Sequence, residues 1–489
     1  MASFQKEGNQ NSLEEGLLPK EDHHANDPSI TNGLQTKAPK KTISAMKWQV
    51  LALLINLQAS AYTFINPVPY APFLCIHLIP GLTEQNAGSY AGVITTMYVL
   101  GTASTSYAWG WIADKYGRRQ VFLWCNFLAI VFSLGFGLSS NIAMAYVSRF
   151  LLGASINFMG TVKTVCSELA MGDRDFEAIF MGFVLGSRGW AGAYATGLSG
   201  YLSDPVKQYP TSWLSTTFVG FLTKYPFFLP NLVGACLSFF GLVTTYFFLP
   251  ETKPTESIER GPKVTMKSIW DKPKTRDHLV TQWFYSFAGV SGLEVLPLFF
   301  VATDGGLSLH ENNIGLIMTT IGIIYVLFQY IVFKKVMSRA GLYGSMLIGS
   351  FCSLPFIIFT PIATLFNKGQ PENTLTIPTY LYLTLLGGLR RVAMPLFMAS
   401  ITIATNRSVK KNEVAIMNGL SSLGASLVQA IGPFSSGLIT SFSLTSDLFS
   451  PSVGIYIPFG IVSVMSFCVF IFVAVGLRKY HRNSDSVTL

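Results

Sequence analysis

Charged residues that interrupt long apolar segments are the first candidates for chemistry in this sequence. A charge at the centre of a bilayer is unfavourable by about 2.5–3.5 kcal/mol even on the more lenient insertion scale, so each such residue suggests a function. Arginine suits the binding of carboxylate or phosphate, because its planar guanidinium offers a two-pronged set of donors. The residues near the middle of apolar segments are Arg149, Arg188, Arg390 and Arg391, with Glu294 somewhat outside the middle.

These residues predict an electropositive binding site. Four positive charges against one negative charge favour a substrate that carries carboxylate or phosphate. Glu294 is the acidic residue that lies inside an apolar segment, and this makes it the candidate for carrying a coupled proton. Structural alternatives stay open. Arg149 could only brace its helix, and Glu294 could form a static ion pair with one of the two adjacent arginines.

The adjacent pair Arg390 and Arg391 raises a geometric question. Neighbouring residues point about 100° apart on a helix, so one interpretation is that only one of the two faces a cavity. For Arg188, a substrate contact and a structural role are equally expected.

Twelve apolar segments must position these residues. Half of all residues are hydrophobic and 12% are charged, which is far from the composition of a soluble domain. A helix needs about 20 apolar residues to cross the hydrocarbon core. The segments are 48–76, 88–112, 119–139, 141–164, 177–201, 226–249, 279–302, 312–333, 342–364, 377–403, 413–440 and 454–477. The sequence therefore predicts an all-α membrane protein with about twelve transmembrane helices.

Other functional classes find little support in the residue pattern. The net charge of +9 comes from basic residues in short connections between apolar segments, and not from one soluble face that would bind nucleic acid. The six cysteines occur singly, without the spacing of a metal site or a disulfide framework. No phosphate-binding loop and no zinc-protease motif occurs. We therefore expect no cofactor, no metal and no enzymatic activity.

The distribution of Lys and Arg predicts the orientation. Basic residues gather in alternate connections, and the opposite side holds only Lys207, Lys224 and Lys368. Because basic loops stay on the cytosolic side, both termini are expected in the cytosol. The first 45 residues are polar and are expected to form a disordered cytosolic tail.

The connection after the second apolar segment has a distinctive pattern. It reads GWIADKYGRR, from Gly110 to Arg119. Further motifs are SRFLLG at 148–153, LPET at 249–252 and NGLSSLGASLVQAIGPFSSG at 418–437. Together they resemble the major facilitator superfamily, and within it the zinc-induced-facilitator-like branch of the drug:proton antiporters. One departure is that Ala195 and Thr196 stand where antiporters of this superfamily usually have a Gly-Pro pair.

The resemblance implies two six-helix halves that alternate in opening to the two sides of a membrane. The expected parts are a cytosolic tail at 1–45, an N-terminal half at 46–250, a cytosolic linker at 251–277, a C-terminal half at 278–477 and a cytosolic tail at 478–489. It also implies that the first, fourth, seventh and tenth helices line a central cavity. The first helix would contribute Gln58, Tyr62 and Asn66, which share one face at i, i+4 and i+8.

The resemblance also gives the loop a role as a latch. Gly110 and Gly117 would permit close backbone approach and a turn. Asp114 would meet the positive end of the eleventh helix, near Glu413, while Arg118 or Arg119 would pair with Glu168. These contacts would hold the halves together when the cytosolic side is closed. The alternative is an ordinary basic loop of a membrane protein.

The sequence thus predicts a secondary transporter of a small organic anion or zwitterion, with proton coupling left open, that works as a monomer in the bilayer. The membrane would be the plasma membrane or a vacuolar or lysosomal one. The alternatives are a drug or cation exporter of the same fold, and a membrane receptor or scaffold that does not transport.

Overall fold

The computed structural model describes residues 46–156, 158–170, 180, 183–184, 186–253, 265–410 and 413–481. Residues Thr42–Leu489 form one compact unit. The predicted N-terminal tail, part of the linker and the last eight residues lie outside the described residues, so nothing here bears on their predicted roles.

The fold is all-α, as predicted. Ten helices within the described residues are long and apolar enough to cross a membrane. Helices suit this medium because they satisfy every backbone hydrogen bond internally. The helices before residue 253 are α1 Lys47–Ile65, α2 Ala71–Leu78, α3 Glu84–Tyr116, α4 Arg118–Gly137, α5 Ile142–Ser155, α6 Phe158–Ala170, η2 Ser187–Trp190, α8 Ala191–Leu202, α9 Pro205–Gln208, α10 Trp213–Thr217, α11 Val219–Lys224 and α12 Phe228–Phe248.

A second set of helices follows residue 265. It comprises α13 Met266–Trp270, α14 Pro273–Val301, α15 Glu311–Phe359, η3 Thr360–Ile362, α16 Ala363–Phe366, α17 Ile377–Asn406, α18 Val414–Thr445, α19 Pro451–Gly454, α20 Tyr456–Ile471, η5 Phe472–Gly476 and α21 Arg478–His481. Element α15 consists of two helices that meet at Gly341, whose φ is +64°. Helix α14 begins inside the predicted linker, four residues before its expected end.

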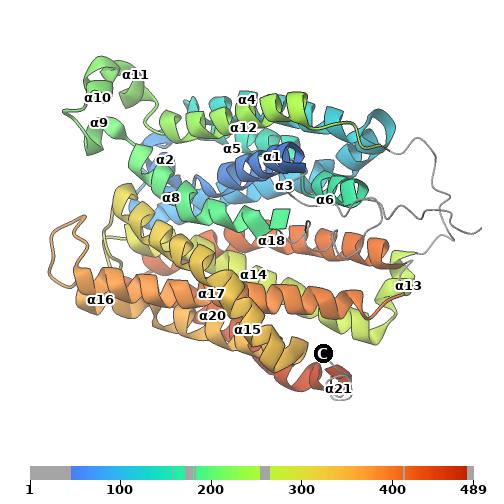
Figure 1. Ribbon diagram of the computed structural model, residues 1–489. Helices are drawn as coiled ribbons and strands as arrows, with labels where there is room; N and C mark the ends of the chain where they lie inside the picture. The colour runs from blue at the N-terminus through green and yellow to red at the C-terminus, as the bar shows by residue number, and fades with distance from the viewer. Residues whose placement is uncertain are drawn as a thin grey trace, which may run out of the picture. The chain divides into compact units, whose positions relative to one another are not determined.

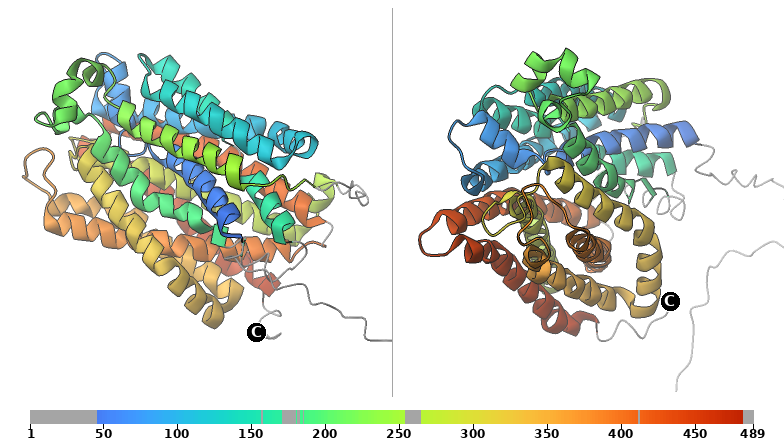
Figure 2. Two further views of the ribbon diagram at one scale, coloured as in Figure 1. Left: turned by 45° about the horizontal axis from the view of Figure 1, so that its top comes forward. Right: turned by 90° about the vertical axis from the view of Figure 1, so that its left-hand side faces the viewer.

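The two sets form adjoining groups of helices that run in a common direction (Figure 1). The right-hand view of Figure 2 shows the same two groups viewed along the helices. One end of the bundle, which we call the basic end, carries α13 and α21 in Figure 1, and the far end carries α9, α10 and α11. We call the helices before residue 253 the N-terminal half and those after residue 265 the C-terminal half.

Glycines bring the two halves together toward the far end. A Cβ atom added at Gly92 of α3 would lie 2.4 Å from the carbonyl oxygen of Pro433 in α18. On the other side of the bundle, a Cβ atom at Gly322 of α15 would lie 2.1 Å from the carbonyl oxygen of Gly192 in α8. Such distances leave no room for a side chain, so the backbones of the two halves are in direct contact there.

Toward the basic end, α3 and α18 separate. Thr102, Ser106 and Gly110 of α3 line a cavity of about 550 Å³ whose opposite wall includes Ser422 and Ser426 of α18. The helices are thus closed against each other at the far end and open at the basic end. This is one of the two states that alternating access requires.

We predict that Gly92→Ala weakens closure of the far end, because the added methyl group overlaps the backbone of α18. The expected result is faster labelling of a cysteine placed at Ser441, which contacts α3 at the far end through Asn86 and Ser89. Gly460→Ala is the matched control, since a Cβ atom there meets no atom within 4 Å. Equal labelling rates in both variants would show that the glycine contact does not control closure.

Candidate functional site

A central cavity of about 240 Å³ lies between the two halves. Its wall is mainly apolar, with Phe64 and Ile65 from α1 and several residues from α14 and α15. Among the described residues that line it, Arg390 and Arg391 of α17 carry the only charges. An apolar pocket with a few convergent polar groups is the usual form of a small-molecule site.

Both adjacent arginines line this cavity, and their guanidinium groups contact different helices. The Nη2 atom of Arg390 donates to the carbonyl oxygen of Gly289 in α14, at 3.0 Å. The guanidinium of Arg391 lies 5.5 Å from the ring centroid of Tyr325 in α15. The interpretation that only one of them can face the cavity is therefore wrong, because a long side chain can bend toward a wall that its Cβ atom does not face.

Arg149 lies elsewhere and is fully buried. Its Nη1 atom donates to the carbonyl oxygen of Thr63 at 2.8 Å, in the last turn of α1. The guanidinium also lies 4.7 Å from the ring centroid of Tyr98 and 5.2 Å from that of Phe136. Because the last carbonyls of a helix have no partner within the helix, Arg149 satisfies one of them and braces α5 against three other helices. This matches the structural alternative, and Arg149 is not among the residues that line the central cavity.

The predicted polar face of the first helix also packs against protein. Gln58, Tyr62 and Asn66 hydrogen-bond to η2, α8 and α12. The bonds run from Gln58 Nε2 to the Ser187 carbonyl oxygen (2.7 Å), from Tyr194 Oη to Gln58 Oε1 (3.1 Å), from Tyr62 Oη to the Pro230 carbonyl oxygen (3.0 Å) and from Asn66 Nδ2 to Asn231 Oδ1 (3.2 Å). The prediction that these three residues bind substrate gains no support from this geometry, since none of them lines the central cavity.

Glu294 joins the two halves. Its side chain on α14 is buried, and its Oε2 atom accepts a hydrogen bond from Thr95 Oγ1 of α3 at 3.2 Å. The contact that the structure shows is therefore with the opposite half, instead of an ion pair with Arg390 or Arg391. A carboxyl group at this position can respond to closure of the far end, because closure brings α3 and α14 together.

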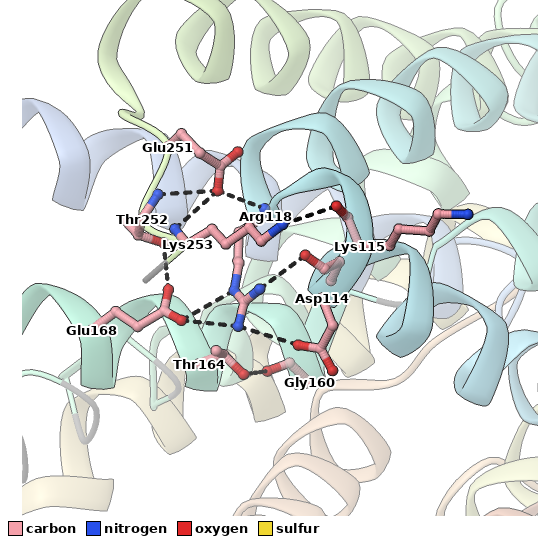
Figure 3. Close-up of polar contacts among 10 residues, drawn as sticks. Asp114, Lys115, Arg118, Gly160, Thr164, Glu168, Glu251, Thr252 and Lys253 are labelled. Atoms are coloured by element: carbon pink, nitrogen blue, oxygen red, sulfur yellow. Dashed lines mark hydrogen bonds and ion pairs between the residues drawn. The ribbon is translucent and has the colours of Figure 1, made fainter. Parts of the chain in front are cut away.

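The loop after α3 is held by a compact group of charges (Figure 3). Arg118, whose side chain is only 9% exposed, lies 3.0 Å from Glu168 of α6 and 3.2 Å from Asp114. Its Nη1 atom also donates to the carbonyl oxygen of Ala113, at 2.9 Å. Of the two arginines considered, Arg118 is the partner of Glu168, whereas the guanidinium of Arg119 lies 5.4 Å from the ring centroid of Tyr246.

Glu251 also belongs to this group, although the sequence motif around Gly110 to Arg119 does not indicate it. Its carboxylate accepts hydrogen bonds from the backbone N–H groups of Arg118 at 2.8 Å and Arg119 at 3.2 Å, at the first turn of α4. A negative group is favourable there because it meets unpaired donors and the positive end of the helix dipole. Gly117 has φ +108°, and a Cβ atom there would lie 2.2 Å from Glu251 Oε2, so the turn requires glycine. The LPET motif at 249–252 contains Glu251, but the predicted boundary after residue 250 assigns this glutamate to the linker.

This group of charges lies within the N-terminal half and does not bridge the halves in this state. Asp114 is 62% exposed and pairs with Arg118, while Glu413 at the start of α18 pairs with Lys272. That hydrogen bond from Lys272 lowers the pKa of Glu413. The predicted contact between Asp114 and the start of α18 is absent from the described residues because the basic end is open. Likewise, a Cβ atom at Gly110 would meet no atom within 4 Å, so the expected close approach is absent here.

Comparison with known proteins agrees with this architecture. The family model described as Major Facilitator Superfamily matches residues 51–368. A probable peptide/nitrate transporter of Arabidopsis thaliana is 25% identical over 77% of this chain and 79% of its own length. The protein ZINC INDUCED FACILITATOR-LIKE 1 of the same plant is 25% identical over 81% of this chain and 84% of its own length.

Solved structures share the fold at low identity. The crystal structure of a D-xylose-proton symporter has a TM-score of 0.66 and 12% identity, over 88% of this chain and 97% of that chain. A bacterial homolog to the human lysosomal transporter Spinster, in an inward-facing and unoccupied conformation, has a TM-score of 0.63 and 13% identity, over 90% of this chain and 99% of that chain. The family match, the two halves and the cavity between them lead to one conclusion: this chain belongs to the Major Facilitator Superfamily of secondary transporters and is similar to its zinc-induced-facilitator-like members.

Proposed function

We propose that this protein transports a small organic anion or zwitterion by alternating access. The observation that carries the proposal is the pair of arginines on the wall of the central cavity, Arg390 and Arg391, in an otherwise mainly apolar lining. A guanidinium binds a carboxylate through two parallel hydrogen bonds, and the apolar wall suits the hydrocarbon part of an organic ion.

Two further observations support this substrate class. The residues that line the cavity include two arginines and no acidic side chain among those described, so the lining is positive and favours an anion. The name of the relative described as a probable peptide/nitrate transporter also indicates zwitterionic or anionic cargo for that protein. If the basic end is cytosolic, as the positive-inside rule predicts, the cavity of this state opens to the cytosol.

A ligand screen on the full-length purified protein tests the substrate class. Anionic, zwitterionic and cationic compounds would be compared by their effect on the thermal unfolding midpoint, since a ligand that binds only the folded state raises it. We expect stabilising compounds to be anions or zwitterions, and the best of them to show saturable uptake into proteoliposomes. Stabilisation confined to cations would favour an exporter of cationic drugs, and binding without flux would favour a receptor.

Glu294 is proposed as the proton-coupling residue. We predict that Glu294→Gln abolishes the dependence of uptake on a pH gradient but leaves exchange of substrate across the membrane. The reason is that an amide can still accept the hydrogen bond from Thr95 but cannot gain or lose a proton. Thr95→Val is the control, because it removes the hydrogen bond and keeps the carboxyl group. Unchanged gradient-driven uptake by Glu294→Gln would remove Glu294 from the coupling mechanism.

A further inference from the structure

The cavity at the basic end holds charges that the proposed central site does not use. This basic-end cavity, of about 550 Å³, is lined by parts of α3, α6, η2 and α18 and by Arg118 of α4. Gln429 lines both this cavity and the central one, so the two are neighbours along the path between the halves. A substrate that enters or leaves through the open basic end must pass it.

Four charged side chains line the basic-end cavity: Asp114, Arg118, Lys163 and Arg188. Asp114 and Arg118 pair with each other, and Arg118 also pairs with Glu168. In contrast, Lys163 and Arg188 have no hydrogen bond or ion pair to any described residue. Two positive charges on this wall therefore lack a counter-charge from the described part of the protein.

Two neutral hydroxyl groups of α3 that line this cavity already donate to backbone carbonyl oxygens. The hydroxyl of Thr102 donates to the carbonyl oxygens of Tyr98 and Gly153, at 3.1 Å each. The hydroxyl of Ser106 donates to the carbonyl oxygen of Thr102 at 2.7 Å. The ammonium group of Lys163 and the guanidinium group of Arg188 are therefore the charged donors of this cavity that have no hydrogen-bond or ion-pair partner among the described residues.

We infer that Lys163 and Arg188 form a second anion-binding station at the mouth of the transport path, separate from Arg390 and Arg391. A carboxylate or phosphate group in this cavity would take the place of water around the two cations, and charge-assisted hydrogen bonds of this kind are the stronger ones. The station would concentrate anions at the mouth, since three positive side chains against one negative side chain give this cavity a net positive charge. The inference rests on the proposed function only in assigning this anion as the transported substrate.

Charged thiol reagents test the station without knowledge of the substrate. The reporter is Ser426→Cys, because Ser426 of α18 lines the same cavity as Lys163 and Arg188. Its labelling rates by an anionic and a cationic methanethiosulfonate of similar size would be compared in the full-length protein, with the parent chain as background for the native cysteines. We expect the anionic reagent to react about tenfold faster or more.

Variants then identify the source of that preference. Lys163→Gln and Arg188→Gln should each lower the anionic-to-cationic ratio several-fold, and both together should bring it near one. Lys410→Gln is the matched control, because it removes an exposed positive charge near the start of α18 that does not line the cavity. Inorganic phosphate should slow anionic labelling more than potassium chloride at the same ionic strength, and only when Lys163 and Arg188 are present.

Several outcomes would overturn the station. A ratio near one in the parent reporter, a ratio that both single variants leave unchanged, or phosphate protection no greater than that of chloride would each do so. If Arg188→Gln does not fold, Lys163→Gln decides the test, since Lys163 is exposed and its loss leaves the packing intact. A cationic substrate with a strong preference for the anionic reagent would contradict the proposed function while leaving the station in place.

Discussion

Arg390→Gln and Arg391→Gln are each expected to weaken apparent substrate affinity by about 10- to 150-fold, which corresponds to about 1.5–3 kcal/mol for a hydrogen bond to a charged group. Both side chains line the central cavity, so each substitution removes one guanidinium group from the place where an anion would bind. Lysine at either position should recover only part of the loss, because it keeps the charge but not the two-pronged geometry. The measurement is the dissociation constant of the compound found in the screen.

The control for these variants is Arg407→Gln. Arg407 follows α17 at the basic end, is exposed and does not line the central cavity. Its loss should change affinity by less than threefold, an order-of-magnitude limit for an exposed charge outside the site. Normal binding by both cavity variants, or tighter binding of a cation by either, would make the two arginines structural and end the anion proposal.

Glu168→Ala is expected to destabilise the protein by about 3–5 kcal/mol, because it removes one partner of a mostly buried ion pair. The side chains of Arg118 and Glu168 are 9% and 15% exposed, so the guanidinium would lose its more buried counter-charge. Asp114→Asn removes the other acidic partner, which is 62% exposed, and should cost less than about 1 kcal/mol. Thermal unfolding in detergent would compare the two variants with the parent chain.

The two variants are also expected to differ in their rate of transport. Asp114→Asn should slow transport although its stability is near that of the parent, because Asp114 is expected to meet the start of α18 when the basic end closes. Transport by Asp114→Asn at the parent rate would remove the latch, and equal stability of Glu168→Ala and the parent would show that the ion pair contributes little.

The sequence alone determined the fold class, and it predicted about twelve spans where ten helices of the described residues are long and apolar enough to cross a membrane. A long apolar segment indicates a membrane-spanning helix, because a helix needs about 20 apolar residues to cross the bilayer. The loop motif also predicted a local contact correctly: Arg118 reaches Glu168. Such contacts follow from the loop and its neighbouring helix, and they depend little on how the halves are arranged.

The tertiary structure decided which polar residues reach the cavity. Arg149 and the polar face of α1 bind backbone and side chains of neighbouring helices and do not line the central cavity. The position of a charge along an apolar segment indicates its depth in the membrane, and helical periodicity indicates the helix face on which it lies. Neither pattern says whether that face meets water or another helix. In contrast, Arg390 and Arg391 both reach the cavity through side chains long enough to turn toward it.

The state of the transporter also depended on tertiary contacts alone. Asp114 is free of α18 because the halves meet at the far end and part at the basic end. One sequence must encode both states of alternating access, so no segment of it can specify which end is open. That choice is made by the small difference in free energy between two packings of the same glycine-lined helices.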